Sequence, residues 1–431
     1  MCFYGVPGIR STRHGSFLAG SSGPHTSPRQ AYELNQESSA PIPRFVPFAY
    51  GFRPFFLLAG WFAVLGMGAW LWLYDAGGAW AAGLPIAQWH GHEMMFGFVV
   101  AAIAGFMLTA VPSWTGTRGF GGWPLVLLTG LWLAGRIAFA LSGLIPFAVV
   151  AVVELAFLPA VAAFLAPPLL RSRNRNSLLL MVLLALWAAD AAFMLGLYRA
   201  DPSLAGAALR FALNLVLLLI TVIGGRIVPA FTANGLRLRG IMVRMRSAVA
   251  LERVVVAAMI LMVLVDAVWP ASMPAGGIAL AAGLAHAWRL AGWNGHRTLR
   301  DPIVWVLHVA YAWLPLGLLL KAAWLLGDLA WAAFWMHALS AGSAASMILA
   351  VMSRAALGHT GRPLRAAPAM AWSYLLLAIA AAIRVFGVVW LPLGYRTTVL
   401  VAGVVWMAAF LIYVTIYTPI LVSPRVDSKP G

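Results

Sequence analysis

Charge and cysteine are both scarce in this sequence, and each shortage excludes a class of protein. Only 10% of the 431 residues are charged, whereas a typical soluble domain carries about a quarter. By contrast, 62% are hydrophobic, and the mean hydropathy is +0.89. A water-soluble fold cannot bury that much apolar surface. The composition therefore predicts a multi-pass membrane protein whose apolar surface contacts the lipid bilayer.

Cysteine occurs once, at Cys2, so an internal disulfide, a CxxC redox pair and a thiolate metal cluster are all excluded. The CxxCH motif that attaches a c-type haem is excluded for the same reason. Any haem would therefore be held non-covalently, as a b-type group. The chain also has no P-loop, no GxSxG and no HExxH motif.

Acidic residues are few as well, since 12 Asp and Glu stand against 29 Lys and Arg and give a formal charge of +17. In a soluble chain such an excess would suggest nucleic-acid binding. Here the basic residues gather in alternate connections between apolar spans, as Lys and Arg do on the cytoplasmic side of membrane proteins. We therefore predict no nucleic-acid partner.

Apolar runs of about twenty residues predict the transmembrane helices. We place twelve of them, near 54–74, 86–111, 123–142, 146–168, 178–198, 204–224, 249–268, 273–290, 303–325, 330–353, 369–389 and 397–418. The basic connections fall on the side of both chain ends, and the opposite connections carry little beyond Arg199, Lys321 and Arg396. The expected fold is an all-α polytopic transmembrane bundle of about twelve helices, with both termini cytoplasmic.

Three segments follow from this pattern. Residues 1–45 are polar and rich in Ser, Gly and Pro, which indicates a disordered N-terminal tail rather than a secretory signal. Residues 46–420 form the transmembrane domain. Residues 421–431 form a short C-terminal tail.

Ionisable side chains inside the predicted spans are the first functional candidates, because charge is costly in hydrocarbon. They are His90, His92, Glu93, Arg136, Glu154, Asp190, Arg210, His308, His337 and Arg384. Glu93, Glu154 and Asp190 could relay protons. The alternative for the charged residues is structural, with Arg136 or Arg210 bridged to Glu154 or Asp190.

The segment "GHEMMFGFVVAAIAGFMLTAVPSWTG" can be aligned with a second one, "WMHALSAGSAASMILAVMSRAALGHTG", at an offset of 245 residues. The offset places His92 on His337, Gly97 on Gly342, Met107 on Met352, Thr115 on Thr360 and Gly116 on Gly361. A repeated membrane composition could also produce such a match. If it is real, both helices run inwards from the outer face and carry histidines at similar depth.

Two neutral imidazoles at one depth on facing helices can supply both axial ligands of a haem iron. Around His337 the residues are nearly all small, which would leave a slot for a flat macrocycle. Small residues would equally suit close packing of helices.

A copper site has its own candidate ligands, His90, Met94, His308 and His359, since imidazole suits copper and thioether suits its reduced form. Each histidine could instead be a buried side chain that makes a hydrogen bond. His90 and His92 are two residues apart and cannot both bind one metal from a regular helix. Either the helix start is unwound or the two histidines serve different purposes.

The stretch "GGRIVPAFTANG" places two glycines before Arg226 at a membrane boundary. Glycine lets backbone N–H groups approach an anion, and arginine pairs bidentately with a carboxylate. A haem propionate would fit Arg226. An ordinary arginine on the cytoplasmic side is equally expected there.

Several blocks of the sequence resemble the NnrS family. They are "FRPFFLLAG", "WHGHEMMFGF", "GGRIVPAFT", "WVLHVAYAWLPLG" and "AVMSRAALGHTGRPL", in this order, and the resemblance runs from about Gly51 to the last span. Residues within these blocks or next to them include His90, His92, Glu93, Arg226, His308, His337, Arg354, His359 and Arg362. The resemblance implies no particular set of metal ligands.

What the resemblance implies is a twelve-helix bacterial inner-membrane protein that contains haem and copper. It also implies a role in nitric oxide metabolism, denitrification or resistance to nitrosative stress, with nitric oxide or an iron–nitrosyl species as ligand. Such a protein could turn nitric oxide over, in which case it needs an electron donor. It could equally only bind or sense the gas.

Combining these observations, we expect His92 and His337 to be the haem ligands and Arg226 to hold a propionate. The rival hypothesis is a proton-coupled secondary transporter. It would use the buried carboxylates Glu154 and Asp190 and would explain the twelve helices and the internal match equally well.

Overall fold

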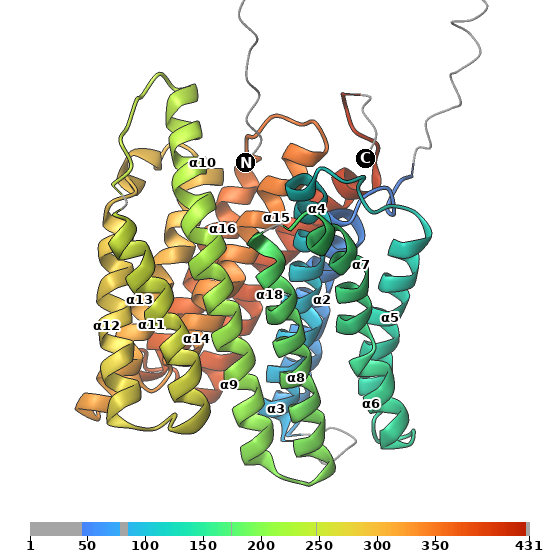
Figure 1. Ribbon diagram of the computed structural model, residues 1–431. Coiled ribbons are helices and arrows are strands. Elements are labelled where there is room, and N and C mark those ends of the chain that lie inside the picture. Colours follow the sequence, from blue (N-terminus) through green and yellow to red (C-terminus); the bar gives the residue numbers. More distant parts are fainter. Residues whose placement is uncertain (1–44, 78–84, 174, 247, 428–431) are drawn as a thin grey trace, which may run out of the picture.

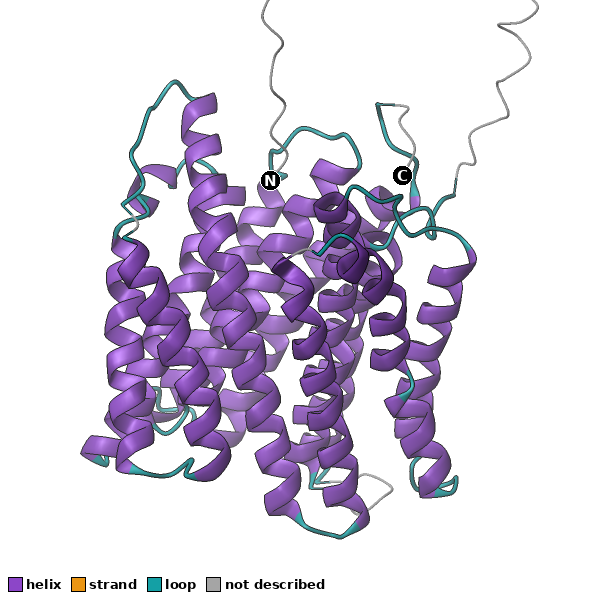
Figure 2. Cartoon of the chain, in the orientation of Figure 1, coloured by secondary structure: helices purple, strands orange, loops and turns teal. Residues whose placement is uncertain are grey.

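The computed structural model describes residues 45–77, 85–173, 175–246 and 248–427. Within these residues the secondary structure is helical and contains no strand (Figure 2). The N-terminal tail expected at residues 1–45 lies almost entirely outside the described residues, so that prediction is untested.

The helices follow one another with short connections (Figure 1). The first half of the chain forms α2 (Phe52–Asp75), α3 (Ile86–His92), η1 (Glu93–Val99), α4 (Val100–Thr115), α5 (Trp123–Ala140), α6 (Phe147–Leu155), α7 (Phe157–Arg171), η2 (Arg175–Ser177), α8 (Leu178–Tyr198), α9 (Pro202–Leu219), η3 (Ile220–Gly224) and α10 (Gly225–Leu238). The second half forms α11 (Val249–Val268), α12 (Met273–Ala291), η4 (Gly295–Thr298), α13 (Pro302–Gly327), η5 (Ala330–Ala332), α14 (Trp335–His337), η6 (Ala338–Ala345), α15 (Ser346–His359), α16 (Pro368–Ala382), η7 (Ile383–Gly387), α17 (Val388–Trp390) and α18 (Gly394–Val422).

Among the described residues, ten continuous helical stretches are long and apolar enough to cross a membrane. This confirms the all-α membrane fold. Helices α11 and α12 have similar lengths but are not among these ten; α11 carries the charged residues Glu252, Arg253 and Asp266, and α12 carries Arg289. Helix α12 packs against α13, and α11 packs against α12 (Figure 1). The count of twelve spans therefore stays a prediction.

Helix starts follow local sequence signals. Pro202 opens α9, and the Asp201 carboxylate accepts hydrogen bonds from the backbone N–H groups of Ser203 and Leu204. Ser272 caps α12 in the same way. Proline in the first turn costs no hydrogen bond, and a capping oxygen satisfies amide groups that the helix itself leaves free.

The two ends of the described chain meet on one side of the bundle. Helices α2 and α18 pack side by side (Figure 1). The buried guanidinium of Arg53 donates to the carbonyl oxygens of Leu421 (2.9 Å) and Ser423 (2.7 Å). The side of the membrane on which these ends lie stays a prediction.

The internal sequence match corresponds to a match in structure. Two π-helical segments, η1 and η6, begin at Glu93 and Ala338, which are 245 residues apart. Helices α5 and α16 begin at the same offset. Each π-helix interrupts a membrane-spanning helix near its start, so the two halves of the chain place equivalent irregularities at equivalent positions.

The two interrupted helices also pack and end alike. Gly97 lies against the ring of Phe62 on α2, and Gly342 lies against the ring of Trp313 on α13. At the other end, Gly116 and Gly361 both adopt a left-handed conformation, with φ of 67° and 73°. The small residues beside His337 therefore serve at least in part to let η6 approach α13 closely.

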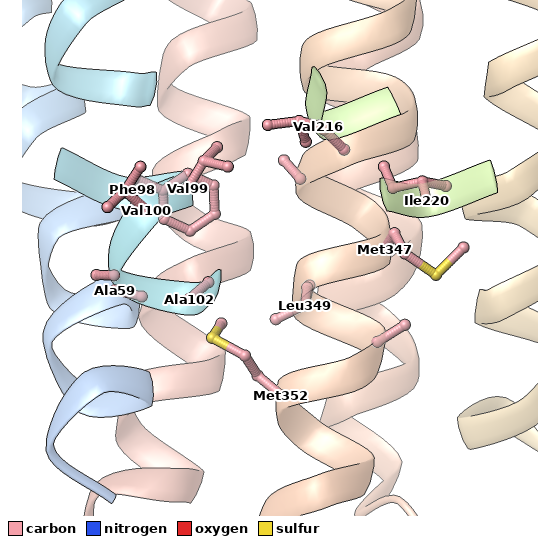
Figure 3. Close-up of a cluster of buried hydrophobic side chains, with 14 of the residues drawn as sticks. Ala59, Phe98, Val99, Val100, Ala102, Val216, Ile220, Met347, Leu349 and Met352 are labelled. Atoms are coloured by element: carbon pink, nitrogen blue, oxygen red, sulfur yellow. The ribbon is translucent and has the colours of Figure 1, made fainter. Parts of the chain in front are cut away.

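An apolar cavity of about 100 Å³ lies between α4, η3, η6 and α15. Met107 and Met352, which are equivalent under the internal match, both line it. Figure 3 shows the side chain of Met352 pointing toward the helix of Ala102, and that of Met347 pointing toward Ile220. The two related halves thus meet around a space that contains almost no polar surface.

Packing at Gly342 provides a test of this arrangement. An added Cβ would come within 2.5 Å of Trp313 Cδ2, whereas a Cβ at Gly130 on α5 would meet open space. We expect Gly342→Ala to lower the free energy of unfolding by about 1–3 kcal/mol, because overpacking forces neighbouring groups apart. Gly130→Ala should be neutral or slightly stabilising. Thermal denaturation in detergent measures both, and equal melting temperatures would contradict the packing described.

Candidate functional site

Five polar side chains from five helical elements gather in the first half of the bundle. His92 ends α3, Glu93 begins η1, and Arg136, Glu154 and Asp190 lie on α5, α6 and α8. All five are buried, with exposures between 0% and 9%. We refer to them as the carboxylate–histidine cluster.

Both ring nitrogens of His92 face carboxylate oxygens. Its Nδ1 lies 3.2 Å from Glu93 Oε1, and its Nε2 lies 3.1 Å from Asp190 Oδ1. Glu154 Oε1 is 3.7 Å from the same Nε2. The imidazole is thus held along its edges by three carboxylates.

The faces of the His92 ring are covered as well. Phe139 and Phe193 stack on it, with ring centroids 4.1 and 4.6 Å away. His92 can bind the iron of a haem only if one of its ring nitrogens gives up a carboxylate contact.

Arg136 bridges the cluster from the other side. Its guanidinium forms ion pairs with Glu93 and with Glu154. One of the ion pairs expected from the sequence, Arg136 with Glu154, therefore exists. Glu154 Oε2 is buried and makes no hydrogen bond. Arg136 pairs with two of the three carboxylates and is the one guanidinium in the cluster, so the fully ionised cluster with a neutral His92 carries two surplus negative charges.

A second group lies near the beginning of both interrupted helices. His90 on α3 stacks on Trp70 of α2, with ring centroids 4.2 Å apart. His337 on α14 lies within electrostatic range of His90, and Arg384 on η7 lies within range of both. His90 Nδ1 is buried and has no hydrogen-bond partner. We refer to His90 and His337 as the histidine pair.

Arg384, beside the histidine pair, has hydrogen-bond donors that no acceptor occupies. Its Nη2 donates to the hydroxyl of Tyr395 (3.2 Å), and its guanidinium lies 4.9 Å from the ring centroid of Phe334. Its Nε and Nη1 are buried and make no hydrogen bond. The N–H groups of these two nitrogens therefore remain for an anionic partner.

His90 and His92 thus face different helices, although they lie two residues apart. His90 contacts α2, whereas His92 faces α5, α6 and α8. Of the two alternatives left open by the sequence, the unwound helix start is not seen, because residues 86–92 form α3; different purposes for the two histidines stay a prediction. The structure brings His337 near His90 and Arg384, and it surrounds His92 with carboxylates.

The other expected copper ligands lie in separate surroundings. His308 Nε2 is 2.8 Å from the hydroxyl of Thr232 on α10. His359 lies between the rings of Tyr50 and Phe52 near the chain ends. Met94 lies against Gly66 on α2. Copper ligation by these residues stays a prediction.

Arg226, expected at a haem propionate, is exposed at the start of α10 and donates to Asn176 Oδ1 at 3.0 Å. Its role at a propionate also stays a prediction.

Sequence reasoning did not find two buried polar groups. Lys321 looked like a charge in an outer connection, but it is 1% exposed within α13 and forms an ion pair with Asp266 on α11. Arg289 on α12 pairs with Glu252 and donates to the hydroxyl of Tyr311. The sequence signal for Lys321 and Arg289 was their position inside long apolar runs. Their ion-pair partners could not be read from the same runs, because the partners lie on other helices.

The bridging role of Arg136 leads to a stability prediction. Arg136→Gln leaves the buried carboxylates of Glu93 and Glu154 without their cation and should cost about 3–5 kcal/mol of unfolding free energy. Arg396→Gln removes an ion pair to Asp75 in which both side chains are about half exposed or more, 65% and 49%, and should cost about 0–1 kcal/mol. Thermal denaturation of both variants in the same detergent measures the difference. A larger loss in Arg396→Gln would contradict the bridging role.

The family model described as NnrS protein matches residues 46–425, and this range contains both the carboxylate–histidine cluster and the histidine pair. The resemblance seen in the sequence is thereby confirmed. No curated protein matches the chain.

Proposed function

Because the chain belongs to the NnrS family, which is associated with haem, copper and the response to nitric oxide, we propose that it is a haem protein of the bacterial inner membrane that handles nitric oxide. The observation that carries the proposal is the histidine pair. His90 and His337 come from two different helices and lie within electrostatic range of one another and of Arg384, which has buried donors without a hydrogen bond.

The histidine pair fits the requirements of a non-covalently held haem. A haem iron between two imidazoles needs ring nitrogens that no stronger partner occupies. The buried Nδ1 of His90 meets this requirement, and the stacked ring of Trp70 holds the imidazole in place. When bound, the haem iron would supply a redox-active metal with affinity for nitric oxide.

His90 is a better partner for His337 than His92 is. The sequence alone led us to expect His92, because it aligns with His337 at the internal offset. In the structure, both nitrogens of His92 already face carboxylates, and phenylalanine rings stack on the imidazole. We therefore propose His90 and His337 as the haem ligands.

Arg384 is the proposed anchor for the charged edge of the haem. Its Nε and Nη1 make no hydrogen bond, so their N–H groups can each donate to a carboxylate such as a propionate. Tyr395 and Phe334 fix the guanidinium. Arg226, the residue expected from the sequence, is exposed on α10 and hydrogen-bonded to Asn176.

The apolar cavity between the two halves suits a small uncharged gas. Cavities lined only by apolar side chains stay dry and accept apolar guests. The cavity around Met107, Met347 and Met352 is of this kind and lies in the middle of the spans. It would let nitric oxide dissolve inside the bundle while ions remain outside.

Optical spectra of the purified protein test the ligands. We expect wild type to show a Soret band, and His90→Ala and His337→Ala to lose it because each removes one iron ligand. His308→Ala is the control, since His308 hydrogen-bonds Thr232 at another place in the bundle and should leave the band unchanged. Loss of the Soret band in His92→Ala but not in His90→Ala would instead support His92 and His337 as the haem ligands, the pair expected from the sequence.

A colourless wild-type protein from haem-replete cells would contradict the proposal as a whole. It would favour the proton-coupled transporter, with Glu154 and Asp190 as proton carriers. Energised uptake lost in Asp190→Asn but kept in His92→Ala would then be the sign of that function.

Haem retention tests the anchor. Arg384→Gln removes the charged donors, so we expect roughly tenfold weaker retention of haem, as for the loss of a charge-assisted hydrogen bond. Arg226→Gln is the matched control and should retain haem like wild type. The haem-to-protein absorbance ratio after dilution into haem-free detergent measures both. Weakening in Arg226→Gln alone would contradict the choice of Arg384.

A further inference from the structure

The carboxylate–histidine cluster has an unbalanced charge that needs a cation. Arg136 offsets one of the three carboxylates and leaves two negative charges buried inside the membrane domain. An uncompensated buried charge costs several kcal/mol. A cation with two positive charges would neutralise the group.

The hydrogen bonding of His92 indicates where this cation would lie. If Nδ1–H donates to Glu93 Oε1, the Nε2 atom carries a lone pair. That lone pair faces Asp190 Oδ1 and Glu154 Oε1, which are acceptors as well. Three electron-rich atoms pointing at one another repel unless a proton or a metal ion lies between them.

The donor spacing is that of a metal site. Ligand atoms of Asp190, Glu154 and His92 all lie within 4.8 Å of one another. Metal–ligand bonds of about 2.0–2.2 Å place neighbouring donors about 3.0–3.6 Å apart. The separations of His92 Nε2 from the two carboxylates, 3.1 and 3.7 Å, are close to this range.

The surroundings supply what a bound ion would need. Glu93 would accept the remaining N–H of the histidine ligand, an arrangement common at metal centres because it orients the ring. A small cavity with room for about one water molecule adjoins Glu154 and Asp190. Glu154 Oε1, the oxygen near His92 Nε2, also pairs with Arg136, whereas Oε2 of the same carboxylate is buried and makes no hydrogen bond.

We propose that His92, Glu154 and Asp190 bind one divalent transition-metal ion, with Glu93 and Arg136 as positioning residues. One imidazole and two carboxylates suit ions such as Zn²⁺, Mn²⁺, Fe²⁺ or Cu²⁺. The set contains no sulfur and does not suit Cu⁺. The site is separate from the histidine pair, so the protein would hold a metal ion in its first half and a haem between its halves.

Elemental analysis of full-length protein purified in detergent tests the proposal. Cells would be grown with Zn²⁺, Mn²⁺, Fe²⁺ and Cu²⁺, and haem iron, determined optically, would be subtracted. We expect about one non-haem divalent ion per chain in wild type. Asp190→Asn and Glu154→Gln should lose it, because each replaces a ligand carboxylate with a neutral amide of the same shape. Glu93→Gln should weaken metal affinity by roughly 10–100-fold without abolishing it.

The control is Asp266→Asn, which replaces another buried carboxylate but one that pairs with Lys321. It should keep the metal content of wild type. Gel filtration and the Soret band report whether each variant is folded. Protein from cobalt-grown cells offers a second readout, because ligand-field absorption bands of Co²⁺ should appear in wild type and vanish in Asp190→Asn.

Two results would overturn the proposal. One is a wild-type protein without non-haem metal that shows the infrared band of a protonated carboxyl group, because protons would then neutralise the cluster. The other is equal metal content in wild type, Asp190→Asn and Glu154→Gln. Neither result depends on the haem. A protein with a Soret band but without non-haem metal would overturn only this metal site, and a colourless protein that contains the metal would overturn only the haem proposal.

Discussion

The absence of water in the membrane interior is the constraint on which the rest of this structure depends. Hydrocarbon cannot solvate a charge, so each ionisable side chain inside the bundle needs a partner from another helix. Arg136, Arg289 and Lys321 each have a carboxylate partner. Nε and Nη1 of Arg384 and Nδ1 of His90 are among the buried atoms that make no hydrogen bond, and these are the groups to which we propose that a haem binds.

The internal repeat explains how one architecture holds two different sites. Phe139 stacks on His92 in the first half, and its equivalent at the offset of 245 residues is Arg384, which lies near His337. One backbone position thus provides an apolar wall in one half and a guanidinium in the other. The carboxylate–histidine cluster in the first half is anionic and suits a cation. The guanidinium of Arg384 in the second half suits a group with negative charges at its edge, such as the propionates of a haem.

The helical spans were predictable because their signal is local. The predicted spans 178–198 and 249–268 coincide with α8 and α11, since the length of an apolar run and its breakers depend only on neighbours in the chain. The ionisable residues of the site were also identifiable, because charge within an apolar run is visible without a structure. Their partners were not, as Lys321 shows, because a residue on α11 completes its ion pair.

By itself, the sequence determined that this protein lies in a membrane, that it is helical, and that any haem is bound without a thioether bond, since these follow from hydropathy and the single cysteine. Only the tertiary structure decided which histidine faces which neighbour. His90 and His92 point to different sides of α3, and the packing of α2 on one side and of α5 and α8 on the other decides which neighbours they meet. Those helices lie far apart in the chain, so no local pattern could report their arrangement.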